Sequence, residues 1–453
     1  MKLKYLKIAA IALVISTVNT SCSNDFVDTK FYQDVEQAPL KTAEEAHSFI
    51  LGTYASMRGG AYYGRDFLAY GEIRSDEMLS NGNFGYYNTV ANYSMTSADS
   101  YASNTYNQMY AAVAKANILI NTDVNVITGG DSKKKQVQYY QGQAYAVRAQ
   151  VFFDLLRLYG QKYSGGTLGV VLPLKYDPKA NMARASITET EAQIEKDFNQ
   201  ALTVMQANNS FENPDAKTEL SINAVKALMT RYYLYKKDYA KVRSLVNDIA
   251  ASYEVAGKSL FKLTYSKKLN GAAPNSIFEL AVGVAAALST DSYGYQLNAD
   301  GYGNVVVQDA AYDSYSDDDI RKELVLSDDY NYLNGKYTDL NGENNIKIIR
   351  IEEVLLNGIE AELNGGDAAK ALQYYNSIIR ERGLAEVVSV DMAMLKAERT
   401  KELLGEGFRQ WDLLRWGDPI PGNTNKLLLA FPIPRGETDI AGTLVKSNPG
   451  YDN

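Results

Sequence analysis

The chain has 453 residues, so it can form a large hydrophobic core and could contain more than one domain. Its net charge is −8, which argues against a broad nucleic-acid-binding surface. With one cysteine, Cys22, and one histidine, His47, the chain can form neither an internal disulfide nor a zinc site built from Cys and His. A nucleophile paired with histidine would depend on His47 alone, so any catalysis would fall to carboxylate, Tyr, Lys or Ser side chains.

The first 21 residues have the pattern of an export signal. Three lysines precede the apolar run IAAIALVI (8–15), which is too short to span a bilayer. Cys22 follows small and polar residues, and this resembles the bacterial lipoprotein site at which the cysteine becomes the first mature residue and carries the lipid. We therefore expect a signal peptide over residues 1–21, lipid attachment at Cys22 and a polar tether over residues 22–40. The alternative is an ordinary signal peptide with an incidental thiol.

Helical periodicity predominates from about residue 104 onward. In GQAYAVRAQVFFDLLRLYG (142–160) apolar residues recur at three- and four-residue steps and extend to a second face. This pattern predicts a helix that is buried on two sides. Further helices are predicted over SITETEAQIEKDFNQALTVM (186–205), SINAVKALMTRYYLYKK (221–237) and DYAKVRSLVNDIAAS (238–252).

An internal repeat indicates how these helices pair. KKDYAKVRSLVNDI (236–249) aligns with GGDAAKALQYYNSI (365–378), and each follows a predicted helix. Residues 350–383 have the length and the helix–turn–helix layout of a tetratricopeptide repeat. We expect about four such units, over 105–160, 188–252, 348–382 and a closing helix at 391–416. The predicted fold is therefore mainly α, with a scaffold of tetratricopeptide-like helix pairs at about 105–255 and 346–420.

Two regions lack helical periodicity and are rich in tyrosine. Residues 58–104 are punctuated by Gly and Asn, and residues 256–345 mix short β-like runs with Gly, Asn and Asp. A tyrosine ring combines a flat apolar face with a hydroxyl group, which suits contact with a ligand at a wet surface. The alternative is that the rings pin long loops onto the helices. We expect these loops to bind the ligand and select, for ring density beside Gly and Asn, the residues Asn83, Tyr86, Tyr87, Tyr293 and Tyr295.

The segment ERTKELLGEGFRQWDLLRWGD (398–418) combines dense charge with both tryptophans. If it is one helix, five charged residues share a face: Glu398, Glu402, Glu406, Arg409 and Asp412. The expected pairs are Arg409 with Glu406 and Asp412, Arg399 with Glu402, and Arg415 with Asp412. We interpret this network as a device for packing rather than as an active site.

Taken together, these segments resemble the SusD/RagB family of outer-membrane nutrient-binding lipoproteins of Bacteroidetes. Five motifs carry the resemblance and span nearly the whole chain: GEIRSDEM (71–78), the 142–160 helix, IIRIEEVLLNGIEAELN (348–364), the 398–418 segment and AFPIPRGETDIAGTLVKSNPGY (430–451). The resemblance implies a single SusD-like domain over residues 41–453, anchored by lipid at the outer membrane and exposed at the cell surface. It further implies that the protein captures oligosaccharides, without a cofactor and without bond cleavage, and delivers them to a SusC-like TonB-dependent transporter.

Three alternatives remain open from the sequence. The first alternative is peptide capture by a RagB-like protein. Glycan binders of the family often present Trp in their binding loops, whereas both tryptophans of this chain lie in 398–418. A tetratricopeptide adaptor that binds only proteins is the second. The third is a glycosidase that uses paired carboxylates. Its candidate acids are Asp76, Glu77, Asp99, Asp291 and Asp317–Asp319. The run Asp317–Asp319 could also offer oxygen ligands to Ca²⁺, although its spacing is not that of an EF-hand.

Overall fold

The computed structural model of the protein describes residues 39–213 and 215–451. The chain divides into two units, Met1–Leu40 and Lys41–Asn453, and the helices and strands of the described residues belong to the second unit. The predicted signal peptide, Cys22 and all of the predicted tether except residues 39 and 40 lie outside the described residues. Within the described part of the chain, no helix is both long and apolar enough to cross a membrane.

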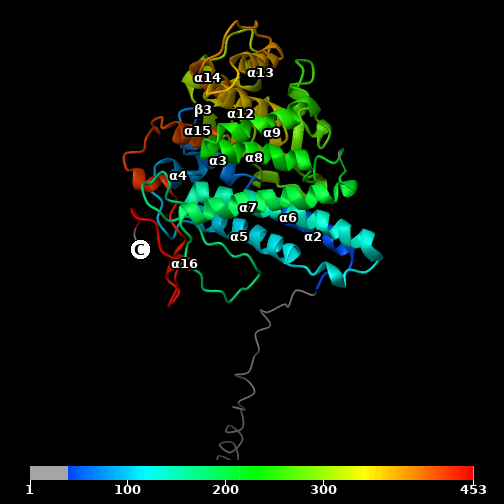
Figure 1. The fold of residues 1–453 in the computed structure, drawn as a ribbon. Helices are drawn as coiled ribbons and strands as arrows, with labels where there is room; N and C mark the ends of the chain where they lie inside the picture. The colour runs from blue at the N-terminus through cyan, green and yellow to red at the C-terminus, as the bar shows by residue number, and fades with distance from the viewer. Residues whose placement is uncertain (1–38, 214, 452–453) are drawn as a thin grey trace, which may run out of the picture. The chain divides into compact units, whose positions relative to one another are not determined.

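Long helices form most of the second unit (Figure 1), and those that follow one another in sequence contact each other from α2 to α9 and from α12 to α13. The helix α12 also contacts α9 and α14, so the later helices continue the stack begun by the earlier ones. The prediction of a mainly α fold built on helix pairs is confirmed. The scaffold helices are α2 (Ala43–Met57), α5 (Ser100–Ile120), α6 (Gly130–Tyr159), α7 (Ile187–Ala207), α8 (Ile222–Lys236), α9 (Tyr239–Ile249), α12 (Ile351–Leu363), α13 (Ala368–Arg380), α14 (Met392–Leu403) and α15 (Arg409–Trp416).

The repeated sequence motif marks the start of the second helix in two of these pairs. Asp238 precedes α9 and accepts a hydrogen bond from the backbone N–H of Lys241 at 3.2 Å. Asp367 precedes α13 and accepts one from the backbone N–H of Ala369 at 2.8 Å. The repeat therefore reflects the same N-cap chemistry used twice, which supplies an acceptor to a free N–H group at each helix start.

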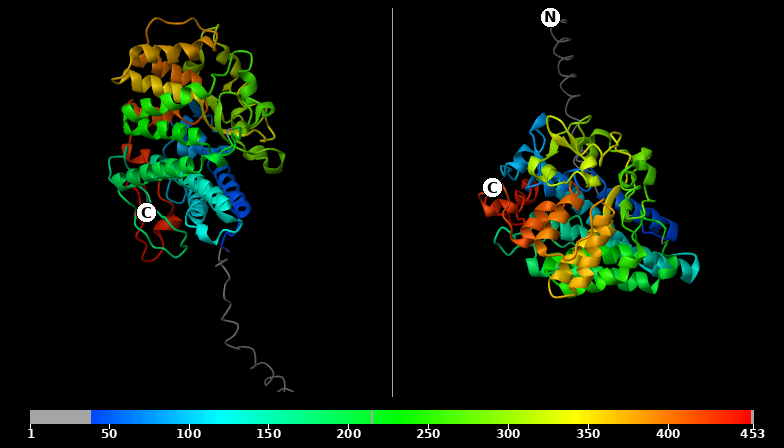
Figure 2. Two further views of the ribbon diagram at one scale, coloured as in Figure 1. Left: turned by 45° about the vertical axis from the view of Figure 1, so that its right-hand side comes forward. Right: turned by 90° about the horizontal axis from the view of Figure 1, so that it is seen from above.

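The two tyrosine-rich regions meet in one small antiparallel sheet. In Figure 2, residues 256–345 lie beside the stacked helices. The strand order of this sheet is β1-β3-β5-β4, and Met78 of β1 is paired with Val307 of β3. A second sheet pairs β2 with β6 and leads directly into α12. The strands are β1 (Met78–Ser80), β2 (Ser276–Leu280), β3 (Val305–Val307), β4 (Leu326–Ser327), β5 (Asn331–Tyr332) and β6 (Ile346–Arg350), and the short helices are α3 (Asp66–Ile73), α4 (Asn88–Ala91), α10 (Tyr293–Leu297), α11 (Asp309–Asp313) and α16 (Arg435–Thr438).

The helix α3 lies within residues 58–104, where the sequence predicted no helix, so that prediction is wrong for this segment. All eight residues of α3 are buried, and a helix enclosed on every side has no polar stripe to reveal its period. Gly71 lies in its middle, although glycine disfavours helices. A β-carbon at Gly71 would lie 2.2 Å from the carbonyl oxygen of Gly407, so only glycine allows α3 to pack this closely against the neighbouring turn.

The charged segment 398–418 forms two helices, and the prediction of one continuous helix is wrong. The helix α14 ends at Leu403 and α15 begins at Arg409. Between them Gly405 and Gly407 have φ values of 75° and 83°, in the left-handed region that glycine adopts without steric cost. This turn changes the direction of the chain and separates the charged side chains that one helix would have aligned.

The ion pairs of this segment differ from the predicted ones for the same reason. Arg409 binds Asp76 with an N–O distance of 2.6 Å, and Arg399 binds Asp412 at 2.8 Å, so neither pairs with the glutamates predicted for it. The pair of Arg415 with Asp412 is present at 2.9 Å. Arginines of this segment therefore connect α15 to α14 and to the loop after α3.

The glutamates of the segment belong to a buried ion network centred on Glu402. Its carboxylate contacts Arg321 at 3.0 Å, Arg350 at 2.7 Å and Arg382 at 2.8 Å. Burial by itself would raise the pKa of Glu402, but Arg382 and then Arg350 hold that pKa well below its usual value. The other members, all largely buried, are Asp319, Lys336, Glu352, Glu398 and Glu406.

Candidate functional site

Four aromatic rings from the two tyrosine-rich regions lie together at the surface of the unit. Phe84 is 74% exposed, and Tyr86, Tyr295 and Tyr302 are half-buried. The ring centroid of Tyr302 lies 5.1 Å from Phe84, 5.2 Å from Tyr86 and 4.8 Å from Tyr295. We call these four residues the aromatic shelf. Such rings offer apolar faces to a ligand and, from the tyrosines, hydroxyl groups at the edge.

Backbone pairing beyond the strands holds the two halves of the aromatic shelf together. The backbone N–H of Asn81 donates to the carbonyl of Asn304 at 3.1 Å, which continues the ladder between β1 and β3. The side-chain amide of Asn81 donates to the carbonyl of Gly303 at 2.8 Å. On the other side, the N–H of Tyr302 donates to the carbonyl of Tyr295 at 2.8 Å. The rings thus lie on loops that several hydrogen bonds fix to the sheet.

The turn that carries Phe84 and Tyr86 is strained. Phe84 and Tyr87 have φ values of 56° and 59°, in a region that costs a residue with a side chain about 1–2 kcal/mol. The Ser80 hydroxyl donates to the carbonyl of Tyr86 at 2.9 Å and accepts from the N–H of Gly82 at 3.3 Å. These bonds hold the turn in the conformation that exposes the Phe84 ring. Strained residues persist where the surrounding structure imposes them, and they occur often at binding sites.

An ion pair gives the aromatic shelf a polar edge. The guanidinium of Arg65 lies 6.0 Å from the ring centroid of Tyr86 and donates to Asp291 at 2.6 Å and to Asp66 at 2.7 Å. Asp66 is buried, and burial raises the pKa of its carboxyl although Arg65 and the Tyr87 hydroxyl oppose the shift. The side chain of Asp291 is 71% exposed, so its carboxylate can accept hydrogen bonds from a ligand while Arg65 holds it in place.

Three of the five predicted binding residues lie at the aromatic shelf. Tyr86 and Tyr295 are two of its rings. Asn83 is exposed and adjoins Phe84 in the same turn, where its backbone N–H donates to the side chain of Asn81 at 3.0 Å. The structure therefore brings together residues that are more than 200 positions apart in sequence, as the prediction of a shared loop surface requires. Their role in binding stays a prediction.

The other two predicted residues, Tyr87 and Tyr293, lie in the interior. Tyr87 is fully buried, and its hydroxyl donates to Asp66 at 2.9 Å. Tyr293 is 3% exposed and packs edge-to-face against Tyr337 with a centroid distance of 5.4 Å. Neither ring can stack on a ligand at the surface, because the register of the turn or helix directs each one inward. The geometry of these two residues agrees with the alternative reading, in which tyrosine rings pin the loops onto the helices. Tyr63 is a further example, because its hydroxyl donates to the buried Asp154 at 2.6 Å.

Sequence reasoning missed two rings of the aromatic shelf, Phe84 and Tyr302. Phe84 carries a signal that could have been used, because a large apolar residue stands between Asn83 and Gly85 in a predicted turn, where burial is least expected. Tyr302 lies in the run Asp300 to Gly303, which has no such feature beyond its flanking glycines. Its central position follows from the pairing of β1 with β3, which the sequence does not reveal.

Most of the candidate acids for hydrolysis have structural partners, and the candidate acids do not gather at the aromatic shelf. Asp319 is bound to Arg321, Asp76 is bound to Arg409, and Asp99 caps the start of α5. Of the candidate acids only Asp291 adjoins the shelf through its bond to Arg65. Across residues 39–213 and 215–451 there is no group of three or more His, Cys, Asp or Glu side chains that could hold a metal ion.

Comparison with known families identifies this arrangement. A family model described as "Starch-binding associating with outer membrane" matches residues 25–234, and one described as "SusD family" matches residues 320–427. The chain belongs to the SusD/RagB family. Phe84 and Tyr86 lie within the first match, whereas Tyr295 and Tyr302 lie between the two matches, in a segment of this SusD-like chain that neither family model covers.

Solved structures of SusD-like proteins share the fold. A SusD superfamily protein from Bacteroides vulgatus is 27% identical, with a TM-score of 0.82, and the match covers 91% of this chain and 100% of that one. One from Bacteroides thetaiotaomicron is 23% identical, with a TM-score of 0.80 and coverage of 90% and 100%. Surface glycan-binding protein A from Bacteroides fluxus is 20% identical, with a TM-score of 0.74 and coverage of 91% and 100%. No curated protein matches the chain.

Proposed function

We propose that the protein captures glycans at the cell surface through the aromatic shelf. The observation that carries the proposal is the cluster of four contacting rings, with Phe84 74% exposed, beside the fixed pair of Arg65 and Asp291. The family description mentions starch binding, and one structural relative is named as a surface glycan-binding protein. A surface that joins apolar rings to charged hydrogen-bonding groups fits a sugar chain, which has apolar C–H faces and a rim of hydroxyls.

Binding follows from the contacts available at the aromatic shelf. The faces of the rings pack against C–H groups of successive sugar units. The carboxylate of Asp291 accepts from sugar hydroxyls, and the guanidinium of Arg65 and the amide of Asn83 donate to ring or hydroxyl oxygens. Hydrolysis would require a second carboxylate on the opposite side of the bond, and none of the candidate acids other than Asp291 adjoins the shelf. The protein therefore binds the glycan without cleaving it.

The destination of the captured glycan follows from the family and from the N-terminal pattern. A lipid on Cys22 anchors the chain to the outer membrane, because the acidic chain by itself has little attraction for an anionic surface. A SusC-like TonB-dependent transporter is the partner that imports the glycan. A shallow surface site binds a glycan with modest affinity. If the transporter and the aromatic shelf bind the same glycan molecule at once, avidity raises the overall affinity.

Calorimetry and glycan arrays on the chain from Ser23 onward test this proposal. We expect oligosaccharides to bind, with affinity increasing with chain length until the rings are covered, and we expect Tyr302→Ala to lower that affinity about tenfold. If peptides bind and saccharides do not, the shelf is a peptide site of the RagB kind. If neither binds while the transporter still co-purifies, glycan capture is wrong, and the protein acts as an adaptor for its partner.

A further inference from the structure

A cavity lies on the inner side of α10, separate from the aromatic shelf. It is bounded by the segment before α3, by α10, by the loop 336–347 and by the turn between α14 and α15. The cavity volume is about 90 Å³, which is space for about six water molecules. Hydrogen bonds from the backbone N–H groups of Leu288 and Ser289 to the carbonyls of Gly342 and Asn341, both at 3.0 Å, hold the loop over it.

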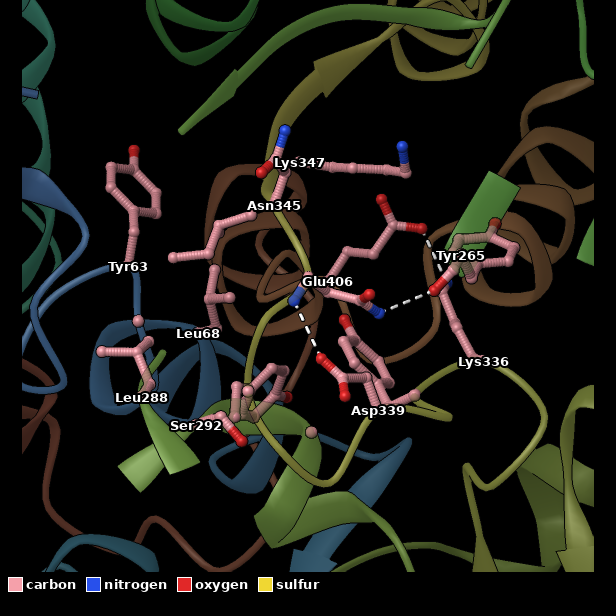
Figure 3. Close-up of a pocket in the computed structure, with 17 residues that line it drawn as sticks. Tyr63, Leu68, Tyr265, Leu288, Ser292, Lys336, Asp339, Asn345, Lys347 and Glu406 are labelled. Carbon is pink, nitrogen blue, oxygen red and sulfur yellow. Dashed lines mark hydrogen bonds and ion pairs between the residues drawn. The ribbon is translucent and has the colours of Figure 1, made fainter. Parts of the chain in front are cut away.

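The two sides of this cavity differ in chemistry. Leu68 and Leu288 lie on one side, next to the ring of Tyr63 (Figure 3). On the other side lie the polar groups of Lys336 and Glu406 (Figure 3). A lining of this kind suits a molecule with one apolar face and one polar rim, and it does not suit a purely apolar ligand.

The charged groups that line the cavity already have partners within the protein. Lys336 donates to Glu406 at 2.6 Å and to the carbonyl of Leu404 at 2.7 Å. Lys347 pairs with Glu279 at 2.9 Å. The carboxylate of Asp339, the remaining charged group, accepts from three backbone N–H groups of its own loop at 2.5 Å, 2.9 Å and 3.2 Å. A charged ligand would have to replace one of these partners, so the lining favours a neutral ligand.

Three buried polar atoms of the lining residues remain without a hydrogen bond. The amide nitrogen of Asn344 donates to the carbonyl of Tyr265 at 2.9 Å, but the side-chain oxygen of Asn344 has no hydrogen-bond partner among the described residues. The same holds for the hydroxyls of Tyr265 and Tyr293, and Tyr293 is 3% exposed. Buried polar groups of native proteins almost always have a partner, so a ligand with hydroxyl groups would supply partners for such atoms.

We propose that this cavity binds one neutral sugar ring, either as a free monosaccharide or as the terminal unit of a glycan chain. The pyranose ring has the required apolar face for Leu68 and Leu288, and its hydroxyls supply partners for Asn344 and Tyr293. The helix α10 separates the two sites: Tyr293 lines the cavity, whereas Tyr295, two residues later on the helix, belongs to the aromatic shelf. The cavity is therefore a second site with its own ligand size.

Tyr293→Phe is the sharpest test, because it removes only an oxygen that makes no hydrogen bond in the protein. The full-length chain is purified in a detergent without a sugar headgroup and titrated with neutral monosaccharides and with oligosaccharides of increasing length. We expect Tyr293→Phe to leave the melting temperature unchanged and to lower the affinity for the ligand of the cavity about tenfold. The variant Tyr302→Ala, on the aromatic shelf, should lose affinity for long chains and keep the affinity for the small ligand.

The results separate the two sources of the ligand and can overturn the assignment. Binding of free monosaccharides that Tyr293→Phe weakens identifies a free sugar. If only oligosaccharides bind, and Tyr293→Phe weakens them, the terminal unit of a chain occupies the cavity. The assignment is wrong if Tyr293→Phe binds every sugar as the wild type does, or if crystals soaked in the sugar show only ordered water in the cavity. Neither result affects glycan binding at the shelf, which Tyr302→Ala tests independently.

Discussion

The aromatic shelf and the buried ion network around Glu402 are both dense in side-chain chemistry, but they differ in what their groups contact. In the network, Glu402 is fully buried and its carboxylate contacts three guanidinium groups. On the shelf, the rings contact one another and present the rest of their surface to solvent, with Phe84 74% exposed. A site needs groups that are left free for a ligand. Charge density alone, which is the more conspicuous feature in the sequence, therefore indicates packing in this protein.

The location of the network explains why the protein keeps it. Arg321 comes from the loop region, Arg350 from the end of β6 and Arg382 from the end of α13, and all three converge on Glu402 of α14. Buried ion pairs seldom add net stability over apolar packing, yet they specify one arrangement of the segments that they join. The network thus fixes the loops that carry the shelf to the helical scaffold.

Glu402→Ala should give the largest effect on stability. It leaves the three arginines without their shared carboxylate in a site that excludes water, and removal of one partner from a buried ion pair costs about 3–5 kcal/mol. We expect the free energy of unfolding, measured by chemical denaturation, to fall by that amount. Arg380→Ala is the control, because Arg380 is 59% exposed in its pair with Glu386 and should cost at most about 1 kcal/mol. A small effect of Glu402→Ala would mean that the network does not join the loops to the scaffold.

Glu72 marks a point where a buried charge is incompletely satisfied. One carboxylate oxygen accepts from the backbone N–H groups of Gly407 and Phe408 at 2.5 Å and 3.0 Å, and the other has no hydrogen-bond partner among the described residues. Burial raises the pKa of Glu72 to about 7, against the effect of the two N–H groups. A carboxyl whose pKa is higher in the folded than in the unfolded state takes up a proton on folding. Stability therefore falls as the pH rises from about 4.5 to about 7.

Glu72→Gln should remove most of this pH dependence, because the amide keeps the acceptor and carries no charge. We expect the free energy of unfolding of the wild type to fall relative to the variant by on the order of 1–3 kcal/mol between pH 5 and pH 8. Denaturation curves recorded across that range measure the difference. Parallel curves for the two proteins would show that Glu72 does not change its protonation on folding.

Tyr302→Ala should give the largest effect on binding with little effect on stability. Tyr302 contacts the other three rings of the aromatic shelf, so its removal breaks the continuous apolar surface. An aromatic contact of this kind contributes about 1 kcal/mol or more, so we expect a loss of about tenfold in glycan affinity by calorimetry. Tyr330→Ala is a matched control, because Tyr330 is 40% exposed and packs against Tyr332, outside the shelf. Equal losses for both variants would contradict the assignment of the shelf.

The sequence predicted the parts of this fold that have a periodic pattern and missed those fixed by close tertiary contact. The amphipathic helices and the repeated segments that contain Asp238 and Asp367 could be recognised because their signals are local. The helix α3 could not, since it depends on the close approach of Gly71 to Gly407 of a distant segment, which no residue pattern within α3 records. The break between α14 and α15 does have a local signal, because Gly405 and Gly407 favour the left-handed conformation that ends a helix, and the prediction of one helix overlooked it.

The same limit applies to the candidate site. Ring density pointed to two loops, and the structure brings these loops together, with Tyr86 and Tyr295 on the aromatic shelf. Their near neighbours Tyr87 and Tyr293 are equally aromatic but point inward. The direction of each ring depends on a turn with positive φ or on a helix of five residues, and a shift by one or two positions changes it. Composition therefore indicated the two loops but could not assign which of their rings face outward.

Phe84→Asn should give the smallest change in stability and separates the two regions most clearly. Asparagine tolerates the left-handed conformation that Phe84 adopts at φ 56°, so the strain of the turn is partly relieved. We expect the free energy of unfolding to stay equal or rise by about 0.5 kcal/mol, while glycan affinity falls several-fold because one ring is lost. Phe84→Tyr, which keeps the ring and the strain, should retain both properties.

A change that stabilises the protein and weakens binding is expected of a residue kept for its ligand. If Phe84→Asn instead destabilises the protein by more than about 1 kcal/mol, the ring packs against the protein and the shelf belongs with the ion network as structure.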